Sequence, residues 1–255
     1  MSDWKMPTNW RDITPRKLNE LAGSHPGRIA HLRWQEWHTI RWAAIVNEQQ
    51  LLAHTARPGE DKDLALELIQ NVRNDRVRQL YFAELYRLLH NYLASVKALV
   101  DHSRRLVDGY TGIDGSTFVD EYRSQTGQLA GNPVVAFVHD LRNVLTHQRL
   151  PGLGVTVSIP DPQADPGRVL ADIFFIRDEL LQQDRMGAKA KVYLRAQAEQ
   201  FPLPEPVAEY ASSVGQVTEW LSSQFDRLHG RQLAEYNEVV EHLRGDFGEG
   251  STGQN

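Results

Sequence analysis

The chain has 255 residues, of which 41% are hydrophobic and 24% charged, a composition typical of a folded globular protein rather than a disordered chain. It contains no cysteine, which excludes disulfides, thiolate metal sites and cysteine nucleophiles. Its 28 basic and 33 acidic residues give a net charge of −5, so the protein as a whole does not attract nucleic acid and any anion site must be local.

The first segment, MSDWKMPTNW, lacks the basic stretch and apolar core of a signal peptide. The longest apolar runs, such as Val134–Val138, are far shorter than the ~20 residues that span a bilayer. We therefore expect a cytoplasmic protein that does not enter a membrane.

The first half of the chain predicts long helices. Residues 1–27 are weakly periodic and predict an N-terminal arm. Apolar residues three and four apart predict a helix over 32–52, which the sequence Arg57-Pro58-Gly59 ends. A second helical region covers about 60–106, with a break expected near 71–75. Its second half carries the clearest apolar stripe, formed by Leu85, Leu88, Leu89, Tyr92, Val96, Leu99 and Val100.

The second half predicts further helices around a small β-hairpin. A short helix at 116–126 precedes one that starts with Asn132 as N-cap and Pro133 in its first turn, and stops at Leu150-Pro151-Gly152. Segments 154–159 and 169–176 predict two strands, a hairpin at about 154–177. Helical periodicity returns at 178–200 and, after a break at 201–204, at 205–243.

These elements predict a mainly α fold, a multi-helix bundle with long antiparallel helices and one β-hairpin insertion. We expect a single domain over 28–245. The polar, glycine-rich segment 246–255 is expected to be a disordered tail.

The residues with the strongest chemical interest lie on the helix that starts at Pro133, in the stretch HDLRNVLTHQRLP at 139–151. At ~100° per residue, its polar side chains fall on one half of the helix and its apolar side chains on the other. The polar half carries His139, Asp140, Arg142, Asn143, Thr146 and His147. Such a half-helix can be a site, or it can simply be solvated, with His147 favoured by the helix macrodipole.

The spacing of arginine and histidine in this stretch is not specific. Chance placement of 22 arginines and 10 histidines predicts about one R-x4-H pair, and the chain has two, Arg33/His38 and Arg142/His147. On a helical wheel His38 falls between Trp34, Ile45 and Trp42, which predicts a packed, structural histidine. Only Arg142/His147 lies on a polar face.

The segment RNVLTH at 142–147 resembles the R-N-x-x-x-H motif of HEPN domains, an all-helical superfamily common in toxin, phage-defence and CRISPR-associated ribonucleases. The likeness covers these six residues and the helical layout of about 29–150. It implies a metal-independent endoribonuclease, of toxin–antitoxin or phage-defence type, that leaves 2′,3′-cyclic phosphate ends and needs no cofactor.

The resemblance also implies roles for the residues. His147 would exchange a proton with the ribose 2′-OH, and Arg142 would neutralise charge on the phosphate. Asn143 would orient the imidazole or bind phosphate, with His139, Asp140 and Thr146 as supporting groups around the site. Because Arg142 and His147 point ~140° apart on one helix, and members of the superfamily commonly pair two motifs, we expect a homodimer through the polar face of helix 133–150. RNA and a nucleotidyltransferase-type antitoxin are the other partners it suggests.

Two alternatives to the ribonuclease stand. A non-catalytic helical interaction or scaffold protein would use its long amphipathic helices for partner binding, with the motif degenerate or structural. A helical-bundle metal enzyme would need Glu-x-x-His pairs, which the sequence lacks. Phosphate-binding glycine loops, G-x-S-x-G elbows and zinc-protease motifs are also missing from the sequence.

Overall fold

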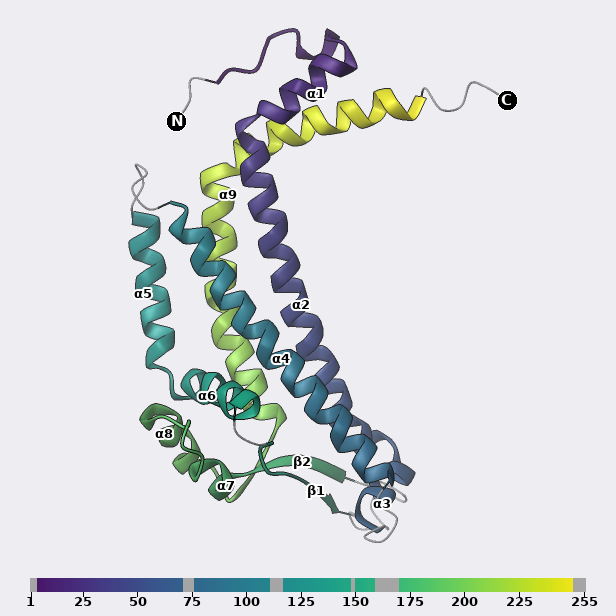
Figure 1. The fold of residues 1–255 in the computed structure, drawn as a ribbon, viewed down its shortest axis with the longest axis vertical. Helices are drawn as coiled ribbons and strands as arrows, with labels where there is room; N and C mark the ends of the chain where they lie inside the picture. The colour runs from purple at the N-terminus through teal and green to yellow at the C-terminus, as the bar shows by residue number, and fades with distance from the viewer. Residues whose placement is uncertain (1–3, 71–75, 111–116, 148–149, 159–169, 250–255) are drawn as a thin grey trace, which may run out of the picture. The chain divides into compact units, whose positions relative to one another are not determined.

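The structure, a computed structural model, describes residues 4–70, 76–110, 117–147, 150–158 and 170–249 (Figure 1). The chain forms two compact units, one of residues 1–39 and 219–255 and the other of residues 40–218. Helices α2 (Pro26–Glu60) and α9 (Pro204–Glu249) each contribute to both units. The predicted mainly α class is confirmed.

The unit of residues 40–218 holds most of the helices. Besides parts of α2 and α9 it contains α3 (Lys62–Gln70), α4 (Arg76–Asp108), α5 (Thr117–Gly131) and α6 (Pro133–His147), followed by α7 (Arg177–Leu181) and α8 (Ala188–Ala196). Helix α6 packs against α4, α5 and α8. The stripe predicted on α4 is buried at every position except Val100, which is half-buried.

A three-stranded antiparallel sheet completes this unit. Its strands are β1 (Leu153–Ser158), β2 (Leu170–Ile176) and β3 (Gln200–Pro202), with β2 in the centre. The β1–β2 pair is the predicted hairpin, in a register that sets Leu153 opposite Phe175. Ile173 and Phe175 alternate inward along β2 and are almost fully buried. Figure 1 shows α3 beside the end of β1, and the two are in contact.

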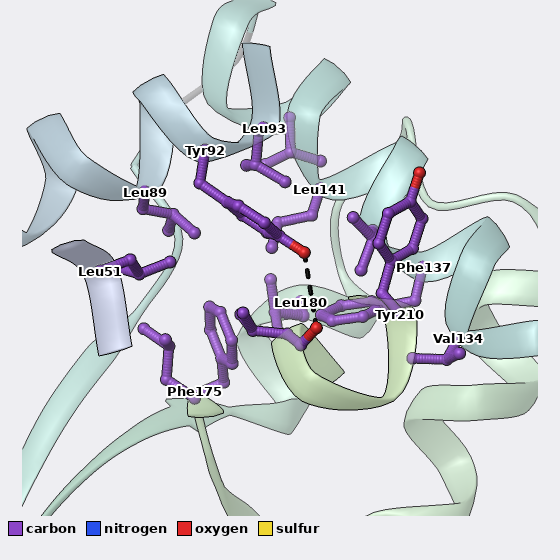
Figure 2. Packing of buried hydrophobic residues seen from close by; sticks show 14 of the residues in the cluster. Leu51, Leu89, Tyr92, Leu93, Val134, Phe137, Leu141, Phe175, Leu180 and Tyr210 are labelled. Atoms are coloured by element: carbon purple, nitrogen blue, oxygen red, sulfur yellow. Dashed lines mark hydrogen bonds between the residues drawn. The ribbon is translucent and has the colours of Figure 1, made fainter. Parts of the chain in front are cut away.

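The core of this unit joins α4, α6 and the sheet. Figure 2 shows Tyr92 of α4 surrounded by apolar side chains, with its hydroxyl donating to the Val207 carbonyl at 3.5 Å. Phe137 of α6 is fully buried, stacks on Tyr193 at 5.1 Å between ring centroids, and meets Phe175 edge-on at 6.0 Å. These contacts fix the apolar side of α6 against the sheet and α8, and so determine which way its polar side faces.

The unit of residues 1–39 and 219–255 has its own small core. Helix α1 (Pro15–Ser24), preceded by a 3-10 turn η1 (Trp10–Asp12), packs Leu18 against Val239 and Leu243 near the end of α9. Trp34 stacks on Phe225 with ring centroids 4.5 Å apart. Gly27 is required where α2 meets α9, because a Cβ there would lie 2.2 Å from the Gln232 carbonyl oxygen.

Several boundaries differ from the predictions. The expected arm contains helix α1, and α2 continues past Pro58 to Glu60. Helix α9 ends at Glu249, inside the segment expected to be disordered, while residues 250–255 lie outside the described residues. The break expected near 71–75 also lies outside them, with separate helices α3 and α4 on its two sides.

The helix predicted over 178–200 is wrong. This segment forms the short helices α7 and α8, and then strand β3, which the sequence analysis missed. Gly187 adopts an extended backbone at the start of α8, where its N–H donates to Asp140 Oδ2 of α6 at 2.8 Å. The interruption therefore depends on a contact with a distant helix, and β3 depends on pairing with the edge of β2.

Candidate functional site

Helix α6 orients the candidate residues as its sequence predicts. Asn132 caps the helix, since its Oδ1 accepts the Val134 N–H at 3.0 Å, and Pro133 occupies the first turn. The predicted apolar half is confirmed: five of its side chains are nearly or fully buried, namely Val134, Phe137, Val138, Leu141 and Val144. The polar half is half-buried or exposed.

Arg142 and Asn143 lie together in a cleft between α4 and α6. The Arg142 Nη1 donates to Asn143 Oδ1 at 3.2 Å, which restrains the guanidinium beside the amide. The cleft has a volume of about 230 Å³ and is called the α4–α6 cleft below. Its lining is Leu93, Val96, Lys97, Val100 and Arg104 from α4, and Val138, His139, Arg142 and Asn143 from α6.

The α4–α6 cleft concentrates positive charge in an acidic protein. Three cationic side chains line it, Lys97, Arg104 and Arg142. Lys97 Nζ is paired with the carboxylate of Asp101 one turn along α4, and this hydrogen bond, with smaller effects of nearby arginines, lowers the pKa of Asp101. Asp101 thus partly balances three cations, which leaves the cleft suited to an anion.

His147 lies apart from that cleft. It is the last residue of α6, its side chain is exposed, and it is not part of the cleft lining. It follows Arg142 by five positions on the helix, a rise of about 7.5 Å. The structure therefore brings Arg142 and Asn143 together and leaves His147 accessible at the end of the same helix.

Two of the expected supporting residues have structural bonds. Thr146 is exposed, and its hydroxyl donates to the Arg142 carbonyl at 2.8 Å, the common back-bond of a helical threonine. Asp140 accepts the Gly187 N–H, and a side chain at Gly187 would place its Cβ 3.2 Å from the same carboxylate oxygen. The Asp140 bond positions α8 against α6, whereas the Thr146 bond is local to α6.

His139 is half-buried on this face. Its Nε2 lies 3.3 Å from the Tyr210 hydroxyl of α9. Burial lowers its pKa, as do the charges of Arg104 and Lys97, while Asp140 and Asp101 act in the opposite direction. The imidazole is therefore neutral near pH 7.

A second cavity adjoins His139 on the other side. It has a volume of about 280 Å³, lies among α4, α5, α6 and α9, and is called the four-helix cavity below. It shares Val100, Arg104 and His139 with the α4–α6 cleft. Its polar lining includes Asp140, Tyr122 and Tyr210, and burial raises the pKa of Tyr122 to about 12.

Sequence reasoning missed the contributions of α4 and α9. Lys97 and Arg104 are seven residues apart, which places them on one side of α4 beside its buried stripe. That spacing is a usable signal for a paired basic face. The sequence does not reveal that this side faces α6, nor that Tyr210 reaches His139.

In the other R-x4-H pair, Arg33 is exposed and His38 is packed among aromatic rings. His38 is half-buried and packs edge-on against Trp34 at 4.1 Å and against Trp37 at 5.3 Å between ring centroids. The aromatic surroundings are confirmed, although Trp37, rather than Trp42, is the second ring.

Comparison of the chain with protein-family models, with curated proteins and with solved structures gives no match. Within the described residues, no three or more His, Asp or Glu side chains are grouped so that they could hold a metal ion. Among the helices of those residues, none combines the length and apolar character needed to cross a membrane.

Proposed function

We propose that the protein is a metal-independent endoribonuclease of the HEPN type, acting as a toxin or in phage defence. The observation that carries the proposal is the cationic α4–α6 cleft, where Arg142 and Asn143 of the RNVLTH segment meet Lys97 and Arg104. Such a cleft can accept a phosphate, because arginine presents planar pairs of N–H donors to it.

The chemistry assigns one role to each residue. His147 takes the proton of a ribose 2′-OH, whose oxygen then attacks the adjacent phosphorus. The bond from phosphorus to the 5′ oxygen breaks, which leaves a 2′,3′-cyclic phosphate; the 5′ oxygen takes a proton from water, and His147 gives up its proton to solvent. Arg142 stabilises the charge on the phosphate oxygens, and Asn143 holds the guanidinium through the 3.2 Å bond.

The proposed enzyme is a homodimer. In one chain, Arg142 lines the α4–α6 cleft while His147 is exposed beyond it, so the two groups do not converge on one phosphate. A second α6 related by a two-fold axis would supply the missing histidine to each arginine. The exposed end of α6 at Thr146 and His147 is accessible for that contact.

The first experiment is cleavage of structured and single-stranded RNA in EDTA. We expect Arg142→Ala and His147→Ala each to lower the rate about 100-fold or more, as loss of a proton-transfer or charge-stabilising group does. Matched controls are Arg105→Ala, an exposed arginine outside the cleft lining, and His31→Ala in the other unit. Equal loss in the controls, or cleavage unaffected by both substitutions, would contradict the proposal.

Mixing the two inactive variants tests the dimer. In a heterodimer of Arg142→Ala and His147→Ala chains, one composite site carries both substitutions and the other carries neither. Random pairing makes half of the dimers mixed, so about a quarter of the wild-type rate should return. A mixture as inactive as its components would argue against sites shared between chains.

A non-catalytic interaction protein is the second candidate. The observation that favours it is the use of Asp140 in a bond that holds α8 against α6. This candidate would be supported if the folded wild-type protein and all motif variants failed to cleave RNA while still binding RNA or a protein partner.

A further inference from the structure

The four-helix cavity and the α4–α6 cleft are adjacent, and they share lining residues. Arg104 and His139 line both. The charge of Arg104 lowers the pKa of His139 and of Asp101 and opposes the rise at Tyr122, so its guanidinium acts on groups from α4, α5 and α6. The two spaces therefore adjoin at a shared cation.

The four-helix cavity has the features of a pocket for a flat heterocycle. Its volume of about 280 Å³ is just below the roughly 300 Å³ at which the usual range of ligand pockets begins. Apolar side chains from all four helices form much of its lining, among them Leu99, Leu129, Val135 and Val214. Tyr122 and Tyr210 complete the lining, although both rings are themselves buried.

The same cavity contains polar groups that can hydrogen-bond to a ligand. A carboxylate accepts hydrogen bonds at both oxygens, and the bond from Gly187 engages only Oδ2 of Asp140. Asp140 therefore retains capacity for an amino or ring N–H donor. The neutral His139 and the Tyr210 hydroxyl form a bonded pair beside it, at 3.3 Å.

We propose that the two spaces together bind one nucleotide, with its base in the four-helix cavity and its phosphate in the α4–α6 cleft on Lys97, Arg104 and Arg142. Where the nucleotide belongs to RNA, this inference rests on the proposed ribonuclease function and makes the cavity the site that holds an unstacked base next to the cleaved phosphate. A free nucleoside monophosphate has the same chemistry and is the other source of the ligand.

The experiment measures binding separately from cleavage. Calorimetry with AMP, GMP, CMP, UMP and inorganic phosphate is carried out on the wild type, Ala136→Leu, Arg104→Gln and Ala83→Leu. Ala136 lines the cavity, so leucine there fills it, whereas Ala83 is an exposed control elsewhere on α4. Anisotropy with a short single-stranded RNA, in a His147→Ala background, supplies the second arm.

We expect Ala136→Leu to weaken nucleotide binding about tenfold or more with an unchanged melting temperature, and Ala83→Leu to have no effect. Inorganic phosphate alone should bind weakly. Its affinity should fall further in Arg104→Gln and stay unchanged in Ala136→Leu. If RNA binding also weakens in Ala136→Leu, the base belongs to the substrate; if only the mononucleotides respond, the ligand is a free nucleotide.

Equal binding of nucleotides and RNA by the wild type and Ala136→Leu, or no nucleotide binding at all, would overturn the inference. These results are independent of the proposed activity. If RNA cleavage depends on His147 but is unaffected by Ala136→Leu, the ribonuclease is supported and the base pocket is not. If the protein cleaves no RNA but binds nucleotides, and Ala136→Leu abolishes that binding, the pocket is supported and the ribonuclease is not.

Discussion

Replacement of Asp140 by alanine removes the acceptor that holds the start of α8 against α6. The lost bond, from Gly187 N to Asp140 Oδ2 at 2.8 Å, has a charged acceptor, for which about 1.5–3 kcal/mol is typical. Asp140 is half-buried, so we take the lower part of that range, about 2 kcal/mol. In a chain of this size that lowers the melting temperature by roughly 4–8 °C.

Thermal unfolding followed by circular dichroism measures the effect, with two comparison variants. Asp140→Asn retains an acceptor oxygen and should lose about half as much stability. Asp120→Ala breaks only an exposed pair with Arg123, N···O 3.2 Å, and should cost about 0–1 kcal/mol. If Asp140→Ala and Asp120→Ala have the same melting temperature, the Asp140 carboxylate does not hold α8 against α6.

Three further predictions concern packing and pH. Phe137→Ala should destabilise the protein by about 3–5 kcal/mol in urea unfolding, because its buried ring stacks on Tyr193; a loss under about 1 kcal/mol would contradict the packing of α6. Gly27→Ala should lower the melting temperature because its Cβ would meet the Gln232 carbonyl oxygen, and Gly23→Ala, which has open space, is the control. The pKa of His139 is lowered on folding, so the unfolded chain binds more protons below about pH 6.5 and stability falls as the pH drops through that range. The facing groups that modulate this are Arg104, Lys97, Asp140 and Asp101; His139→Asn should flatten the dependence of melting temperature on pH, and an unchanged slope would assign it to other histidines.

The helices with a continuous apolar stripe were predictable because their pattern is local. The stripe of α4 and the two halves of α6 follow from a period of 3.6 residues, and Asn132 with Pro133 marks the start of α6 in the sequence itself. The β1–β2 hairpin was predictable for the same reason, since each strand carries enough β-branched and apolar residues.

Elements that depend on distant partners were not predictable. Strand β3 has three residues and includes Pro202, so it carries no alternation and exists through its pairing with β2. The interruption between α7 and α8 follows from the buried Met186 and the bond of Gly187 to Asp140 on another helix. Single-segment periodicity contains no information on such contacts.

The sequence by itself determined the mainly α class and the polar face of α6 that carries Arg142, Asn143 and His147, because side-chain direction on a helix depends only on spacing. Only the tertiary structure decided what each of these groups faces. It packs α4 beside α6, so that Lys97 and Arg104 join Arg142 in a cleft, and it encloses His139 against Tyr210 of α9. Those neighbours are set by helix packing between segments far apart in the chain, and packing follows from the burial of the apolar faces, not from the polar residues of the site.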